Sequence, residues 1–305
     1  MQRRDLLGTA FGAAITAIPA VHASVTDNFG DKTRPVDTKN AARGWGTGAV
    51  KPIEIKGCKI GEGRPKLIAP TTSKTPDDLY ATVQKFAGMA PLDMIEVRID
   101  YLGKLQPAQY AEITRNAYKA AGNKIVLVTL RNGTDGGPFV ADDKYYGDVY
   151  RAVIESGAAD IIDLELFRDA AMVRSLVKAA HAKGIKVIIS DHEFKFTPDE
   201  GEIVRRLLLE QEFGADILKI AVMALSPEDA LTVMSATAKM RHYYTDRPML
   251  TMAMGKWGVL TRITGEGFGS DLTFASVGGK ASAPGQIPAE DCLTVLETLH
   301  KAMNP

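Results

Sequence analysis

The sequence is poor in cysteine and has no excess of charge of either sign. Cys58 and Cys292 are the two cysteines among 305 residues, which excludes a scaffold held together by disulfides. We expect two unpaired thiols, with a single bridge between them as the alternative. The 37 basic residues match the 37 acidic ones, so charge indicates neither nucleic acid nor an anionic membrane as partner. The expected ligand is a small molecule, and this expectation fits both a binding protein and an enzyme.

Long apolar runs are also missing. Residues 8–20, GTAFGAAITAIPA, form a mild apolar stretch that is too short to span a membrane. Arg3 and Arg4 precede it, and VHA (21–23) follows with small residues that signal peptidase accepts, which resembles a twin-arginine export signal. The sequence predicts an export signal over 1–23 and a periplasmic protein with no stable membrane span after its removal. An uncleaved anchor or an amphipathic N-terminal stretch is the alternative.

Two further regions follow the predicted signal. Residues 24–50 are polar, rich in glycine and without period, which predicts a flexible linker before a folded domain over 51–305. From residue 66 the chain repeats one unit, a short apolar run, a polar turn and an amphipathic helical stretch. The runs cover residues 66–69, 94–99, 124–130, 160–166, 185–190, 216–222, 248–254 and 272–277.

The helical stretches carry recognisable boundaries. Thr75 as N-cap and Gly88 as stop delimit the first, and a later one runs over 197–214 to end at Gly214. The seventh, over 258–270, is short and broken by glycines.

Eight such units over roughly 240 residues predict a (β/α)₈ barrel, a TIM barrel in the α/β class. A doubly wound open sheet is the alternative, but it would need a glycine-rich phosphate loop after an early strand. GEGFGS (265–270) comes late and lacks the GxGxxG spacing. Residues 52–63 alternate around Gly57 and predict a hairpin that closes the bottom of the barrel.

Alternate strand residues of a closed barrel face inward, and chemistry gathers at the C-terminal strand ends. This rule sends a set of polar side chains into the interior: Glu96, Arg98, Arg131, Asp163, Glu165, His192 and Lys219. Taken singly, the acids and arginines also fit ion pairs that fill the barrel, and the histidine fits a structural loop residue. Met252 and Met254 are core-like, and at least one is expected to line the cavity.

Lys219 is the anomaly of the set because it interrupts an apolar strand, ILKIAVM. Desolvation and nearby arginines lower the pKa of a lysine, which leaves an amine that attacks carbonyls. His192, one strand away, can then remove a proton next to the imine and pass it to a leaving group. The residues indicate an imine-forming lyase or aldolase. A metal site of Asp163, Glu165, Asp191 and His192 and a non-catalytic exported binding protein remain alternatives.

Several stretches resemble type I 3-dehydroquinate dehydratase: GEGRPKLIAP, MIEVRID, IIDLELF, SDHEFKFTP, GADILKIAVM, MGKWGVLTRITGEGFGSDLTF and KASAPGQI. They occur in the family's order from about residue 50 to 303. The resemblance implies a barrel that dehydrates 3-dehydroquinate without metal or organic cofactor. It leaves the oligomeric state open, with a homodimer as one compatible assembly.

The resemblance also implies roles for individual residues. Lys219 matches the lysine that forms the imine, His192 the general acid/base, and Arg262 the arginine that holds the substrate carboxylate. Glu96, Arg98 and Arg131 match residues that bind the ring hydroxyls. Further residues are predicted to line the pocket or close it: Met252, Met254, Phe274, Ser282 and Gln286.

Three departures from the family are visible. Asp135 stands where a glutamate usually orients the catalytic histidine, and its shorter side chain is expected to loosen that hydrogen bond. Pro70 replaces a small hydroxyl residue at the end of the first strand. The export signal suggests that the protein acts in quinate breakdown outside the inner membrane and not in cytoplasmic biosynthesis.

Overall fold

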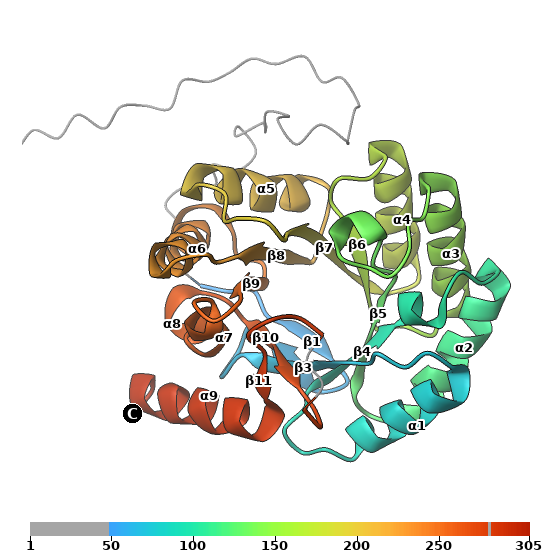
Figure 1. Cartoon of the computed structure of the whole chain (residues 1–305), viewed down its shortest axis with the longest axis horizontal. Coiled ribbons are helices and arrows are strands. Elements are labelled where there is room, and N and C mark those ends of the chain that lie inside the picture. The colour runs from blue at the N-terminus through green and yellow to red at the C-terminus, as the bar shows by residue number, and fades with distance from the viewer. Residues whose placement is uncertain (1–48, 280–281) are drawn as a thin grey trace, which may run out of the picture.

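The computed structural model describes residues 49–279 and 282–305, and these form a (β/α)₈ barrel (Figure 1). The predicted export signal and nearly all of the predicted linker lie outside the described residues. The barrel strands are β3 (Lys66–Pro70), β4 (Met94–Arg98), β5 (Ile125–Thr129), β6 (Ile161–Glu165), β7 (Lys186–Glu193), β8 (Ile217–Met223), β9 (Met249–Met254) and β10 (Leu272–Ser276). Each ladder between consecutive strands from β3 to β9 is parallel, and β10 pairs with β3.

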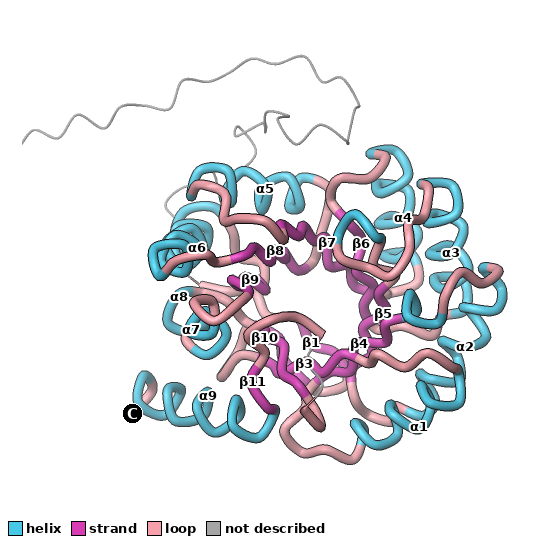
Figure 2. The backbone as a smooth tube through the Cα atoms, viewed as in Figure 1, coloured by secondary structure: helices cyan, strands magenta, loops and turns pink. Residues whose placement is uncertain are grey.

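Helices surround this ring of strands, as Figure 2 shows. They are α1 (Pro76–Ala87), α2 (Pro107–Ala120), α3 (Asp143–Ser156), α4 (Ala170–Ala182), α5 (Glu200–Glu212), α6 (Pro227–Lys239), α7 (Val259–Ile263), α8 (Gly265–Phe268) and α9 (Ala289–Met303). A short strand, β11 (Ile287–Pro288), lies parallel to β10. None of these helices is long and apolar enough to cross a membrane.

The predicted helix boundaries are partly confirmed. Thr75 caps α1 by accepting a hydrogen bond from the Asp78 N–H, and Gly88 ends the helix. The seventh unit is indeed short and broken, as α7 and α8. The stretch predicted over 197–214 is present as α5, which begins at Glu200 because Asp199 is its N-cap and accepts a hydrogen bond from the Glu202 N–H.

Four aspartates secure the bottom of the barrel in one repeated arrangement. Each precedes an even-numbered strand, and its backbone N–H and side-chain oxygen bond the carbonyl and N–H of one residue on the preceding strand. The pairs are Asp93 with Leu67, Asp160 with Val126, Asp216 with Val187, and Asp271 with Met249. The last pair joins β9 to β10, where no strand ladder forms, so side-chain and loop hydrogen bonds complete the ring.

The predicted hairpin is present as β1 (Ile53–Ile55) and β2 (Cys58–Ile60), which pair antiparallel. Its turn places Lys56 and Gly57 at positive φ of 50° and 77°, a pair of values typical of a type I′ turn. Ile60 is fully buried against the apolar residues that fill the lower interior of the barrel. The hairpin therefore seals the end opposite the polar residues. Cys58 and Cys292 are both unpaired, so the disulfide alternative is wrong.

The interior changes character from bottom to top. The first inward residues of the strands are apolar: Ile68, Met94, Ile125, Ile161, Ile188, Ile217, Leu250 and Leu272. Above them the inward positions become charged on β4, β6 and β8, with Glu96, Asp163 and Lys219 all buried. The buried charged groups therefore lie above a packed apolar layer, which separates them from solvent at the N-terminal ends of the strands.

Candidate active site

A pocket opens at the C-terminal ends of the barrel strands, and all twelve sequence-predicted site residues line it. These are Glu96, Arg98, Arg131, Asp135, His192, Lys219, Met252, Met254, Arg262, Phe274, Ser282 and Gln286. Parallel strands bring their C-terminal ends to one edge, which is why residues spread over 191 positions meet here, from 96 to 286. Their placement is established, whereas their individual roles stay predictions.

Lys219 lies at the centre of the site and has a charged partner. Its side chain is 3% exposed, and Nζ lies 2.6 Å from Oδ2 of Asp163 on β6. The ring of Phe274 lies on another side, 5.0 Å from Nζ to its centroid. Lys219 therefore has a carboxylate partner as well as an aromatic neighbour. Leu218, Ile220 and Val222 of β8 face outward into the core beneath the helices, whereas Lys219 faces inward beside Asp163.

Asp163 is bonded from several directions. Its Oδ1 accepts hydrogen bonds from Arg131 Nη2 at 2.8 Å and from Ser190 Oγ at 2.6 Å, while Oδ2 accepts from Lys219. Burial alone would raise the pKa of Asp163, but Arg131 and then Lys219 outweigh it and hold that pKa well below its ordinary value. Asp163 therefore stays ionised and fixes the Lys219 amino group at the bottom of the pocket.

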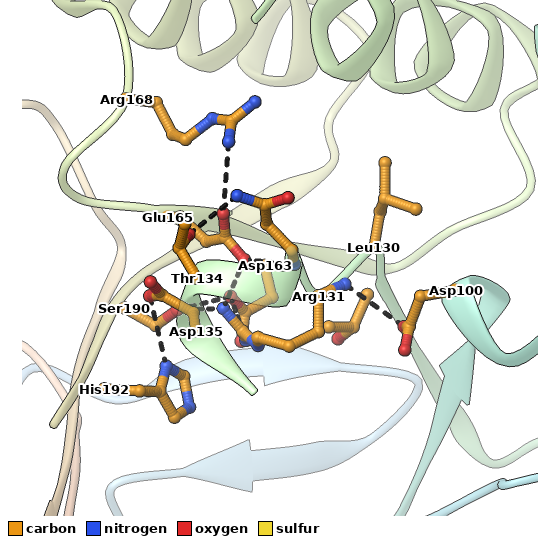
Figure 3. A network of polar contacts seen from close by, with 12 residues as sticks. Asp100, Leu130, Arg131, Thr134, Asp135, Asp163, Glu165, Arg168, Ser190 and His192 are labelled. Atoms are coloured by element: carbon orange, nitrogen blue, oxygen red, sulfur yellow. Dashed lines mark hydrogen bonds and ion pairs between the residues drawn. The ribbon is translucent and has the colours of Figure 1, made fainter. Parts of the chain in front are cut away.

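His192 faces Asp135 across a gap that is too long for a direct hydrogen bond. Nδ1 lies 3.7 Å from Asp135 Oδ2 and, among the described residues, forms no hydrogen bond (Figure 3). The predicted loosening at this position agrees with that distance. Burial first, then Arg131 and Lys219, lower the pKa of His192 well below its ordinary value, although Asp163 opposes them. The imidazole is thus neutral and able to accept a proton.

Phe194 and Gly136 hold this pair from the solvent side. The Phe194 ring stacks on His192 with centroids 6.1 Å apart and planes 12° apart. Gly136 has φ +86°, and a Cβ there would lie 2.4 Å from the Phe194 ring. A side chain at residue 136 would therefore push Phe194 away from the histidine. Sequence reasoning missed both residues, although GTDGGP and DHEF placed them beside predicted site residues.

Arg262 is a buried cation with no acidic partner among the described residues. It is 1% exposed, donates from Nη2 to the Pro284 carbonyl at 3.1 Å, and its Nη1 lies 3.4 Å from the Met252 sulfur. Burial lowers its pKa to about 10, with only the Cys292 thiol opposing. A guanidinium desolvated in this way favours an incoming anion, and its planar fork suits a carboxylate.

The loop that follows β10 borders Arg262. Ser282 and Gln286 bond each other, from Ser282 N to Oε1 and from Nε2 to Ser282 Oγ, both at 3.0 Å. Gly285 has φ +82°, and a Cβ there would lie 2.6 Å from the Gly255 carbonyl oxygen. The glycine of SAPGQ thus lets the loop lie directly on the end of β9.

Glu96 and Arg98 occupy the opposite wall. Oε1 of Glu96 accepts a hydrogen bond from Thr129 Oγ1 at 2.8 Å. Arg98 donates to both oxygens of Asp100, at 2.9 and 2.8 Å, and packs on the Tyr101 ring. This wall is therefore polar and held by its own contacts, as a surface that binds hydroxyl groups requires.

The residues of the metal alternative do not converge. Asp191 faces away from the pocket and pairs with Arg206 of α5 at 2.6 Å, because it alternates with His192 along β7. Asp163 forms ion pairs with Arg131 and Lys219. No group of three metal-ligating side chains occurs among the described residues. The geometry favours the alternative in which a lysine is the reactive group.

The fold and the pocket together define a (β/α)₈-barrel enzyme with a buried lysine beside a histidine. Residues 67–303 match the family model of type I 3-dehydroquinase. A 3-dehydroquinate dehydratase of Salmonella typhimurium is 40% identical over 260 residues, 83% of this chain and 100% of that protein. One from Syntrophotalea carbinolica is 38% identical over 249 residues, 81% of this chain and 98% of that protein.

Solved structures give the same result. A type I 3-dehydroquinate dehydratase from Clostridium difficile, with covalent modified comenic acid, has a TM-score of 0.77 at 36% identity, covering 83% of this chain and 99% of its own. The enzyme from Enterococcus faecalis has a TM-score of 0.76 at 33% identity, covering 81% and 99%. The chain belongs to the type I 3-dehydroquinase family.

Proposed function

We propose that the protein dehydrates 3-dehydroquinate to 3-dehydroshikimate through an imine on Lys219. The observation that carries the proposal is the meeting of three groups in one pocket: the Lys219 amine, the neutral His192 imidazole and the Arg262 guanidinium, which has no acidic partner in the described part of the chain. A cyclic keto acid with hydroxyl groups complements these groups and the polar wall of Glu96 and Arg98. The relatives named 3-dehydroquinate dehydratase support the choice of substrate.

The reaction balances with the groups present. Lys219 Nζ adds to the substrate ketone, and loss of one water gives a protonated imine, which withdraws electrons from the adjacent carbon. His192 removes a proton from that carbon, and the electron pair forms the ring double bond as the neighbouring hydroxyl leaves. The proton taken by His192 leaves with that hydroxyl as a second water. Hydrolysis of the imine consumes one water and frees Lys219, so the net loss is one water.

Reductive trapping tests this proposal. Borohydride added in the presence of 3-dehydroquinate is expected to reduce the imine to a stable amine. Mass spectrometry of proteolytic peptides should then find the added mass on the peptide that contains Lys219. The folded protein treated with borohydride alone is the control. An active protein that gives no adduct would rule out the imine, and a folded protein with neither adduct nor activity would favour a binding role.

We also propose that the protein is exported and acts on dehydroquinate that an oxidation outside the inner membrane supplies. Arg3 and Arg4 support this proposal, and both precede the residues that match the family model. A twin-arginine route carries folded proteins, and this barrel has no disulfides among its described residues that would need oxidative folding.

Cell fractionation tests the location. The mature protein is expected in the periplasmic fraction, and the Arg3→Lys, Arg4→Lys double variant is expected to stay in the cytoplasm at full length. A cytoplasmic marker enzyme controls for leakage. Finding both forms in the cytoplasm would contradict the export proposal. That result would not bear on the proposed dehydratase activity.

A further inference from the structure

Asp163 lies against the reacting nitrogen, yet the proposed reaction gives it no step. It lies on β6, and its side chain is fully buried. Lys219 Nζ donates to Asp163 Oδ2 at 2.6 Å, a distance typical of a charge-assisted hydrogen bond. Asp163 therefore contacts the atom that becomes the imine nitrogen.

The carboxylate of Asp163 is fixed through its other oxygen. Oδ1 accepts hydrogen bonds from Ser190 Oγ at 2.6 Å and from Arg131 Nη2 at 2.8 Å, on the side seen in Figure 3. These two donors are also bonded to one another, because Arg131 Nη1 donates to Ser190 Oγ at 3.1 Å. The same Nη1 donates to Glu165 at 3.2 Å. Asp163 thus presents Oδ2 to Lys219 at a position that three neighbouring side chains define.

Other charged and titratable groups surround this ion pair. They are Glu96 and Arg98 of β4, Arg131 after β5, Glu165 of β6, His192 of β7, Glu210 of α5 and Tyr150 of α3. Glu210 bonds the backbone of Lys219 and not its amine, since its Oε2 accepts the Lys219 N–H at 2.7 Å. In the part of the chain that the structure describes, Lys219 Nζ forms its one ion pair with Asp163. The negative charge that Nζ meets directly is therefore that of Asp163.

We infer that Asp163 is a catalytic residue, the counter-ion that keeps a proton on the Lys219 nitrogen while the imine forms and decays. This inference rests on the proposed function. A protonated imine has a single N–H, and Oδ2 already lies where the Lys219 nitrogen donates, so Asp163 also fixes the plane of the imine. Desolvation and the nearby Arg131 would otherwise favour loss of that proton. A neutral imine withdraws electrons from the adjacent carbon less strongly.

The charge on the nitrogen balances at each step of the reaction. An ammonium group and a ketone give a protonated imine and one water, so Nζ carries one positive charge before and after. When His192 removes the carbon-bound proton, the electron pair moves to Nζ and the positive charge passes to the imidazole. The charge returns to Nζ as the hydroxyl leaves with the proton of His192 as water. Hydrolysis then restores the ammonium group, again beside Asp163.

Trapping as a function of pH in Asp163→Asn tests this role. Cyanoborohydride reduces protonated imines in preference to neutral ones. With 3-dehydroquinate present, the rate of adduct formation in the unchanged protein is expected to stay level between about pH 6 and pH 9, because Asp163 keeps Nζ protonated. In Asp163→Asn it is expected to fall about tenfold or more over the same range. We also expect kcat of this variant to fall about 10²-fold near neutral pH.

Asp191→Asn is the matched control. Asp191 is equally a buried aspartate paired with an arginine, Arg206 at 2.6 Å, but it faces away from the pocket. This variant should keep the level profile of the unchanged protein. A structural role of Asp163 would lower trapping by the same factor at every pH. A level profile in Asp163→Asn would therefore overturn the inference.

A measurement on the unchanged protein covers the case in which Asp163→Asn does not fold. With lysine labelled by ¹⁵N at Nζ, the resonance of the substrate-bound protein distinguishes a protonated from a neutral imine. We expect the protonated form at about pH 8, and a neutral imine there would overturn the inference. An unchanged protein that gives no adduct at any pH would contradict the proposed function itself. An adduct on Lys219 with a profile that falls in the unchanged protein would contradict only the role of Asp163.

Discussion

Replacing Lys219 by alanine is expected to lower kcat by about 10⁴-fold or more, because no other group in the pocket can form the imine. The described pocket contains no second lysine. Steady-state assay of the ultraviolet absorbance of the conjugated product measures the effect. The same variant should give no adduct in the borohydride experiment.

Lys219→Arg is the matched control for the electrostatic part of this effect. Lys219 Nζ lies 2.6 Å from Asp163, so alanine leaves that buried carboxylate with Arg131 and Ser190 as partners. Arginine keeps a positive charge for Asp163 but cannot form the imine. We expect it to be as inactive as alanine while unfolding closer to the unchanged protein. Substantial activity in either variant would show that Lys219 is not the nucleophile.

Replacing His192 by alanine is expected to lower kcat by about 10²- to 10⁴-fold, because proton removal and departure of the hydroxyl both lose their acid/base group. Imine formation needs only Lys219, so this variant should still be trapped by borohydride on Lys219. It should show a larger trapped fraction at steady state than the unchanged protein, since the intermediate decays slowly. Quantitative mass spectrometry of the intact protein measures that fraction.

The pH profile adds a second expectation for His192. Its pKa is lowered by burial, Arg131 and Lys219, so the imidazole remains neutral through the neutral range. Loss of kcat by protonation of His192 should therefore appear only well below the ordinary histidine pKa of about 6.5. His192→Gln, which keeps a polar group of similar reach, controls for packing against Phe194. A variant as active as the unchanged protein, or one that cannot be trapped, would contradict the role assigned to His192.

Much of the architecture was predictable because it is local. Strand alternation placed Glu96, Arg98 and Lys219 inward without any knowledge of neighbouring strands. Caps such as Thr75 act within one turn of helix, so the start of α1 was also predictable. The exact start of α5 was not predictable in the same way, because TPD (197–199) offers two capping residues and only the backbone path selects Asp199.

Other features depend on the order and stagger of strands, which no short stretch of sequence encodes. The aspartates before even-numbered strands bond residues at least 22 positions earlier. The pairing of Arg131 with Asp163 likewise requires β5 and β6 to be neighbours at one register. Such contacts join residues that are far apart in the sequence, so they can be assigned only from the order and register of the strands in the barrel.

The sequence by itself determined the barrel, its inward-facing residues and the lysine–histidine chemistry, because period-two alternation and residue type are properties of each segment alone. The tertiary structure decided the electrostatics. It paired Lys219 with Asp163 across 56 positions and set Asp135 Oδ2 3.7 Å from His192 Nδ1. It also placed Arg262 away from every acid of residues 49–279 and 282–305. Charges interact through space over distances set by strand stagger and burial, and the sequence does not state either quantity.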